Sequence, residues 1–97
     1  MRVIWSDPAL AELASIKEYI ATDSPLTAEK FTLNLHKKID ETLQDFPKYG
    51  RKIPEMDRED FREIIHGNYR IVYHVKKEVL SILAVRNSRQ IFKDKFH

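Results

Sequence analysis

The 97-residue sequence contains no cysteine, only two glycines and no long hydrophobic run. Without thiols the chain cannot form a disulfide scaffold, a thiolate zinc site or an iron–sulfur cluster, and it has no cysteine nucleophile. Two glycines are too few for a phosphate-binding loop, and no apolar run approaches the roughly 18 residues that a membrane span needs. We therefore expect one small cytoplasmic domain over residues 1–97, with one modest core and no contact with a membrane.

Charge is distributed unevenly along the chain. Residues 1–46 carry a net charge of −3 and residues 47–97 one of +5, although the total is only +2. The second half includes six arginines, and the planar guanidinium group suits bidentate contact with phosphate or carboxylate. Such a division is typical either of two differently solvated faces or of a surface that attracts an anionic partner.

The first half of the sequence predicts a short strand and two helices. Residues 2–5 form an apolar-rich run that ends at a Ser-Asp-Pro triplet, a typical helix start. Apolar residues then recur every three or four positions up to residue 20, and again over residues 28–46 in steps of 3, 4, 4, 4 and 3. Because the connection between the two patterns is short, the helices should form an antiparallel hairpin.

The second half predicts a loop followed by three strands. Residues 48–60 hold a glycine, a proline and many charges, and are expected to form a surface loop with a short strand at 52–53. Runs rich in Ile, Val, Tyr and Leu follow at 61–65, 69–75 and 79–86, and their short polar connections predict an antiparallel meander. The fold class is therefore α+β: an N-terminal strand and an antiparallel helical hairpin packed on one face of a small antiparallel β-sheet.

Catalytic and metal-binding patterns are sparse. The acidic residues at 55–60 are typical of a solvated patch rather than of a general acid and base pair. The four histidines show none of the close helical spacing that builds a zinc site, so we expect no metal and no cofactor. They are His36, His66, His74 and His97.

Arginine and aromatic side chains gather on the predicted sheet. Alternation along the middle strand places Arg70 on one face and Tyr69 and Tyr73 on the other. We expect the helices to cover one face and the arginine to lie on the exposed one. Stacking and guanidinium contacts are typical of single-stranded RNA binding, but the same residues would also suit an acidic peptide or a protein surface.

Several stretches of the sequence carry a recognisable pattern. They are WSDPA at 5–9, IKEYIA at 16–21 with DSP at 23–25, FPKYGR at 46–51, REII at 62–65, GNYRIVY at 67–73 and VLSILAVR at 79–86. In this order they resemble the RelE/ParE toxin superfamily, and the resemblance extends from residue 3 to about residue 91. It implies a single toxin domain from a bacterial type II toxin–antitoxin pair, which forms a hetero-oligomer with a cognate antitoxin encoded by an adjacent gene.

Two mechanisms divide this superfamily. RelE-like toxins cleave mRNA on the ribosome with basic side chains and a terminal aromatic or His, whereas ParE-like toxins poison DNA gyrase and cleave nothing. For a nuclease the resemblance implies Arg62, Arg70 and Arg89, but the C-terminal tyrosine has no counterpart and Asn87 stands where many relatives carry histidine. We therefore expect a ParE-like gyrase inhibitor that is not an enzyme. The alternatives are an mRNA endoribonuclease and an inactive relative that only binds its antitoxin.

Two binding surfaces are expected on such a toxin. The polar residues of the sheet and of the end of its last strand should contact the cellular target: Arg70, Arg86, Asn87 and Arg89. An amphipathic or acidic antitoxin segment should cover the helical hairpin and the sheet edge, at residues that are mostly apolar: Leu13, Tyr19, Phe31, Leu35 and Arg62.

Overall fold

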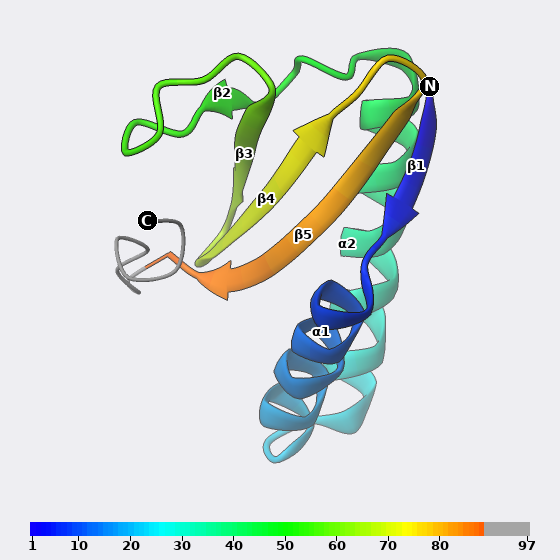
Figure 1. Ribbon diagram of the computed structural model, residues 1–97. Helices are drawn as coiled ribbons and strands as arrows, with labels where there is room; N and C mark the ends of the chain where they lie inside the picture. The colour runs from blue at the N-terminus through cyan, green and yellow to red at the C-terminus, as the bar shows by residue number, and fades with distance from the viewer. Residues whose placement is uncertain (89–97) are drawn as a thin grey trace.

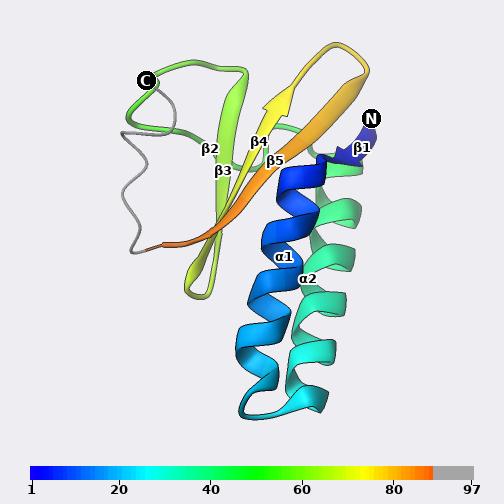
Figure 2. The same cartoon turned by 60° about the horizontal axis from the view of Figure 1, so that its bottom comes forward.

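Five strands and two helices make up residues 1–88, the part of the chain that the computed structural model describes. In chain order they are β1 (Arg2–Trp5), α1 (Asp7–Ala21), α2 (Pro25–Asp45), β2 (Arg51–Lys52), β3 (Phe61–His66), β4 (Tyr69–Val75) and β5 (Val79–Asn87). The strands form a sheet in the order β1-β5-β4-β3-β2, and the two helices lie beside it as a hairpin (Figure 1). Turning the molecule shows both helices on the same side of the sheet (Figure 2). The α+β class is confirmed.

β1 forms one edge of the sheet and runs parallel to β5. Arg2 stands opposite Val79 and Trp5 opposite Ile82, whereas the other neighbouring strands pair antiparallel. Parallel strands need a long connection between them, and here both helices and the rest of the sheet separate β1 from β5 in the chain. Because β1 ends at Trp5, no strand within residues 1–88 lies on that side of β5 beyond Ile82.

The two helices begin where local capping predicts. The Ser6 hydroxyl accepts a hydrogen bond from the Ala9 N–H at 3.2 Å, and the Ser24 hydroxyl accepts one from the Thr27 N–H, also at 3.2 Å. Each cap is followed by a proline in the first turn, where its missing N–H removes no helical hydrogen bond. The predicted helical hairpin is therefore confirmed, with α2 beginning at Pro25.

The main core lies between the helices and the sheet. It combines apolar side chains of α1 and α2 with those of β4 and β5. Leu13 and Leu35 belong to this core, with exposed fractions of 9% and 0%. The apolar stripe of each helix is used against the sheet, and contact of Leu13 and Leu35 with an antitoxin stays a prediction.

Tyr73 is the largest fully buried side chain in this core, and its hydroxyl is satisfied. The oxygen accepts a hydrogen bond from the Gly50 N–H at 2.8 Å, which ties the turn before β2 to the centre of the sheet. In Tyr73→Phe that N–H would lose its acceptor. We expect the free energy of unfolding to fall by about 1–3 kcal/mol, the cost of an unsatisfied buried donor, as measured by urea denaturation near neutral pH.

The same tyrosine makes the stability of the protein pH-dependent in the alkaline range. Burial raises the pKa of Tyr73 above its ordinary value of 10.0, and the hydrogen bond from Gly50 offsets only part of that rise. The unfolded chain therefore ionises at a lower pH than the folded protein, so this contribution to stability is lost as the pH rises above about 10. The advantage of the wild type over Tyr73→Phe should shrink over that range. A constant difference would contradict this assignment.

The other face of the sheet is partly covered by residues 53–60. Ile53 is 1% exposed and packs against Val72 and Ala84, with Met56 beside them. The segment is a loop with most of its residues exposed, as expected, but Ile53 is buried and the short strand lies at Arg51–Lys52 instead of 52–53. Its apolar side chains bury against the strand face that alternation turns away from the helices.

Candidate functional site

The two strand arginines that a nuclease would need, Arg62 and Arg70, lie on opposite faces of the sheet. Arg62 stands opposite Tyr73 in the pairing of β3 with β4, and Tyr73 faces the helices. Arg70 meets Glu63, which stands opposite Val72 on the other face. Directly paired residues share a face of a sheet. The two guanidinium groups therefore do not converge on one phosphate.

Arg62 holds the segments that flank β2. Its Nη1 donates to the carbonyl oxygen of Gly50 at 2.8 Å, and its Nη2 lies 2.7 Å from a carboxylate oxygen of Glu59. Its Nε also donates to the Glu59 carbonyl oxygen at 3.0 Å. Only 12% of this side chain is exposed. Its donors bind backbone and carboxylate oxygens of the same chain, and contact of Arg62 with an antitoxin stays a prediction.

Arg70 is buried in an ionic cluster and not exposed as expected. One oxygen of Glu63 accepts hydrogen bonds from Nε and Nη2 of Arg70, and the other accepts from Nε and Nη2 of Arg51 at 2.8 and 2.7 Å. Glu63 is 1% exposed and Arg70 is 9% exposed. A buried carboxylate needs a cation beside it, and this requirement explains why Arg70 turns inward.

His74 anchors the end of the segment that covers the same face. Its Nε2 lies 3.0 Å from a carboxylate oxygen of Asp60, and its ring packs on Phe61 with centroids 4.4 Å apart. Desolvation acts in the opposite direction, but hydrogen bonds from His74 and Arg58 hold the pKa of Asp60 below its ordinary value. These contacts support the interpretation of His74 as a structural polar residue.

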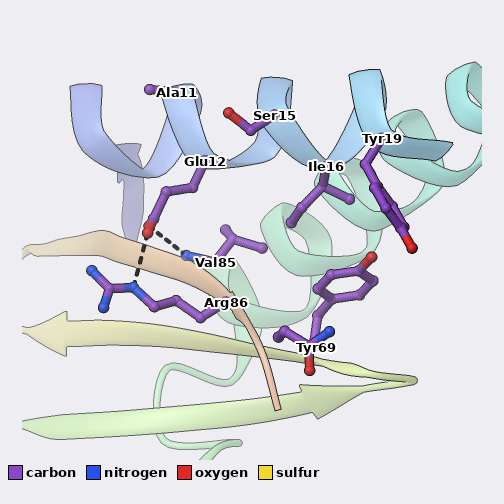
Figure 3. A pocket seen from close by; sticks show the side chains of 9 residues that line it. Ala11, Glu12, Ser15, Ile16, Tyr19, Tyr69, Val85 and Arg86 are labelled. Atoms are coloured by element: carbon purple, nitrogen blue, oxygen red, sulfur yellow. Dashed lines mark hydrogen bonds and ion pairs between the residues drawn. The ribbon is translucent and has the colours of Figure 1, made fainter. Parts of the chain in front are cut away.

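An open groove of about 440 Å³ lies between α1 and the end of β5 (Figure 3). It brings together residues that the sequence assigned to two different surfaces: Arg86 and Asn87 from the target set, and Tyr19 from the antitoxin set. Tyr19 is 75% exposed. Arg89 lies outside the described residues. The remaining walls come from α1 and from the ends of β4 and β5: Ala11, Glu12, Ser15, Ile16, Tyr69 and Val85.

Glu12 is the residue of this groove that the sequence did not identify. One carboxylate oxygen accepts a hydrogen bond from the Val85 N–H at 3.0 Å, and the other accepts from Nε of Arg86 at 2.8 Å (Figure 3). Glu12 lies on the polar side of the α1 pattern, which gives no sign of a partner 74 positions away. Only the packing of α1 on β5 brings the two together.

Phe31 lies behind the groove rather than in it. Its ring packs against those of Tyr69 and His66, with centroid distances of 5.6 and 6.0 Å. Tyr69 lines the groove, so Phe31 supports one of its walls from α2. Direct contact of Phe31 with an antitoxin stays a prediction.

Residues 1–88 offer neither a metal site nor a membrane-spanning helix as a further candidate. No group of three or more His, Asp or Glu side chains in this range is arranged to hold a metal ion. Neither of the helices in the same range combines the length and the apolar character that crossing a membrane requires. The groove beside α1 is therefore the site from which the function is argued.

Known proteins resemble this chain over almost its whole length. The sequence model of the ParE toxin of the type II toxin–antitoxin system parDE matches residues 3–92. Toxin RelE2 of Caulobacter vibrioides is 31% identical over 90 residues, which are 93% of this chain and 98% of that protein. A chain in a solved structure titled chromosomal ParDE TA system from P. aeruginosa shares the fold, with a TM-score of 0.74 and 21% identity. The match covers 90% of this chain and 95% of that chain.

Proposed function

Because the chain belongs to the ParE toxin family and is the toxin of a type II toxin–antitoxin system, we propose that it acts by binding DNA gyrase and does not cleave mRNA. Its other partner is the antitoxin that such a system implies. The names of its relatives include both ParE and RelE, so they do not separate the two mechanisms. The choice rests on the residues of the site.

The observation that carries this proposal is that the arginines a nuclease would need form hydrogen bonds within this chain. Cleavage through the ribose 2′-hydroxyl needs a base, an acid and cations for the phosphorane. Arg62 and Arg70 lie on opposite faces and bind oxygens of this chain. The resemblance implies that many relatives have histidine at the position of Asn87, and a side-chain amide acts as neither an acid nor a base near neutral pH.

The groove beside α1 offers what binding alone requires. Arg86 and Asn87 line it from β5, and the exposed side chain of Tyr19 lines it from α1. Tyrosine and arginine are among the residues that carry most binding energy at protein interfaces. We place gyrase contacts at Arg86 and Asn87. An antitoxin that covers the groove would then neutralise the toxin by hiding them.

Purified protein freed of its antitoxin should inhibit gyrase supercoiling and accumulate gyrase–DNA cleavage complexes. The same protein should produce no codon-specific cuts in toeprinting on translating ribosomes. Cuts on ribosomes with gyrase unaffected would contradict the proposal and favour the RNA-cleaving alternative. No effect on either would favour an inactive relative that only binds its antitoxin.

Arg86→Ala should weaken gyrase inhibition by about 30-fold, which corresponds to about 2 kcal/mol for an arginine at the centre of an interface. Lys77→Ala is the matched control, because Lys77 is an exposed cation in the turn between β4 and β5. The dose of each variant needed for half-maximal inhibition of supercoiling gives the comparison. Equal losses in the two variants would contradict a specific role for Arg86.

A further inference from the structure

One edge of β5 changes its hydrogen-bond partners midway along the strand. Up to Ile82 the partner is the backbone of β1, and the last such bond runs from the Ser6 N–H to the Ile82 carbonyl oxygen at 3.0 Å. Beyond this point side chains bond to the strand. The Ser6 hydroxyl donates to the Leu83 carbonyl oxygen at 3.4 Å, and the Val85 N–H donates to Glu12 at 3.0 Å.

Glu12 therefore occupies the position that a neighbouring strand would take. Its carboxylate supplies the acceptor that a strand carbonyl would supply to Val85. Open strand edges are templates for pairing, and proteins often protect them with a charged side chain. The Glu12 side chain is 29% exposed, so rotation about its own bonds moves the carboxylate away from β5 without moving α1.

We propose that the edge of β5 from Leu83 to Asn87 receives an extended segment of the antitoxin, which displaces Glu12. A main-chain carbonyl of that segment would accept from the Val85 N–H, and a carboxylate of the segment would take the place of Glu12 at Arg86. Each hydrogen bond of Glu12 is thus replaced by a hydrogen bond to the segment. The inference rests on the proposed function in placing the antitoxin over this groove.

The two faces of β5 specify the side chains of that segment. Val85 belongs to the core on the helix side, and Arg86, the next residue, projects to the other face. An added strand alternates in the same way. Its side chains on the helix side would enter the groove between Ile16, Tyr19 and Tyr69, whereas the next side chain along would lie near Arg86. The matching segment alternates apolar or aromatic residues with acidic ones.

Charge favours the antitoxin over a second copy of this chain as the occupant. Pairing two β5 edges would bring two copies of Arg86 to the same interface, and like charges at paired positions are destabilising. An acidic segment has the opposite charge. The edge therefore selects an acidic partner.

The test compares Glu12→Ala with the wild type in binding to the antitoxin encoded beside this chain. Removing the internal competitor should tighten binding by about 3- to 10-fold, the value of one hydrogen bond to stability. Glu12→Gln keeps an acceptor and loses the charge, so its affinity for the antitoxin should lie between those of the wild type and Glu12→Ala. This variant replaces Glu12→Ala in the test if the alanine variant does not fold. Glu18→Ala, an exposed carboxylate on the same helix, should bind like the wild type.

Hydrogen exchange of the Val85 amide reports on the edge directly. Exchange should be faster in free Glu12→Ala than in the free wild type, and the antitoxin should slow it in both. Weaker or unchanged binding of Glu12→Ala would overturn the inference, as would Val85 exchange that the antitoxin leaves unchanged. If free Glu12→Ala formed dimers that persisted after the antitoxin was added, the occupant of the β5 edge would be a second copy of this chain and the inference would be wrong. None of these measurements involves gyrase, so a failure of the gyrase proposal is distinguished from a failure of this one.

Discussion

Replacing Glu63 by glutamine should lower the free energy of unfolding by about 3–5 kcal/mol, the usual cost of breaking a buried ion pair by removing one partner. The Glu63 side chain is fully buried and divides its two oxygens between Arg70 and Arg51. A glutamine amide offers one oxygen and turns its NH₂ group toward the other guanidinium. Arg51 is 62% exposed and can return to water, but Arg70 stays buried with much of its charge uncompensated.

Chemical denaturation of Glu63→Gln beside Glu55→Gln gives the measurement. The Glu55 carboxylate also approaches Arg70, at 3.7 Å, but the Glu55 side chain is 40% exposed, so its loss should cost no more than about 1 kcal/mol. The double replacement Glu63→Leu with Arg70→Met should recover most of the stability, because an apolar pair leaves no buried charge. Equal losses for Glu63→Gln and Glu55→Gln would show that burial of the pair does not matter.

This cluster also decides how arginine variants should be interpreted. Arg70→Glu would place a second carboxylate against Glu63 in a buried site, so loss of toxicity in that variant would reflect loss of the fold. Arg86 lies at the groove, with 21% of its side chain exposed. Variants of Arg86, not of Arg70, therefore test contact with the target.

Gly50→Ala should lower the free energy of unfolding by about 3 kcal/mol, at the upper end of the usual cost of overpacking. A Cβ at this position would lie 2.5 Å from the Glu63 carbonyl oxygen, and 2.8 and 2.9 Å from the hydroxyl oxygen and Cε1 of Tyr73. Neither neighbour can retreat cheaply. The carbonyl belongs to the backbone of β3, and Tyr73 is buried in the core.

Gly67→Asn is the matched control for this effect. Gly67 has a φ of +59°, and a Cβ added there would meet no atom within 4 Å. Asparagine tolerates this left-handed conformation better than most residues. Thermal unfolding should show a loss of about 1 kcal/mol or less for Gly67→Asn. If both variants were equally destabilised, the close approach at Gly50 would not be the cause.

The local elements of this protein could be predicted from the sequence because their signals are local. The three-and-four spacing from Ala28 to Leu43 places one apolar stripe on one helix, and α2 follows it from Pro25 to Asp45. Phe46, the last residue of the predicted pattern, follows the end of the helix and is exposed. The β-branched and aromatic run at residues 69–75 corresponds to β4 over its full length. Capping and periodicity act between residues a few positions apart, so the sequence alone determined these elements and the α+β class.

The partners of the charged residues were decided only by the tertiary structure. Alternation correctly placed Arg70 on the face away from the helices, but it could not show that residues 53–60 cover that face and that Glu63 lies there. Glu12 meets Arg86 across 74 positions of the chain. A charge that packing removes from water needs an opposite charge nearby, and any opposite charge that the fold brings close can fill this role. The local sequence around a charged residue therefore does not identify its partner.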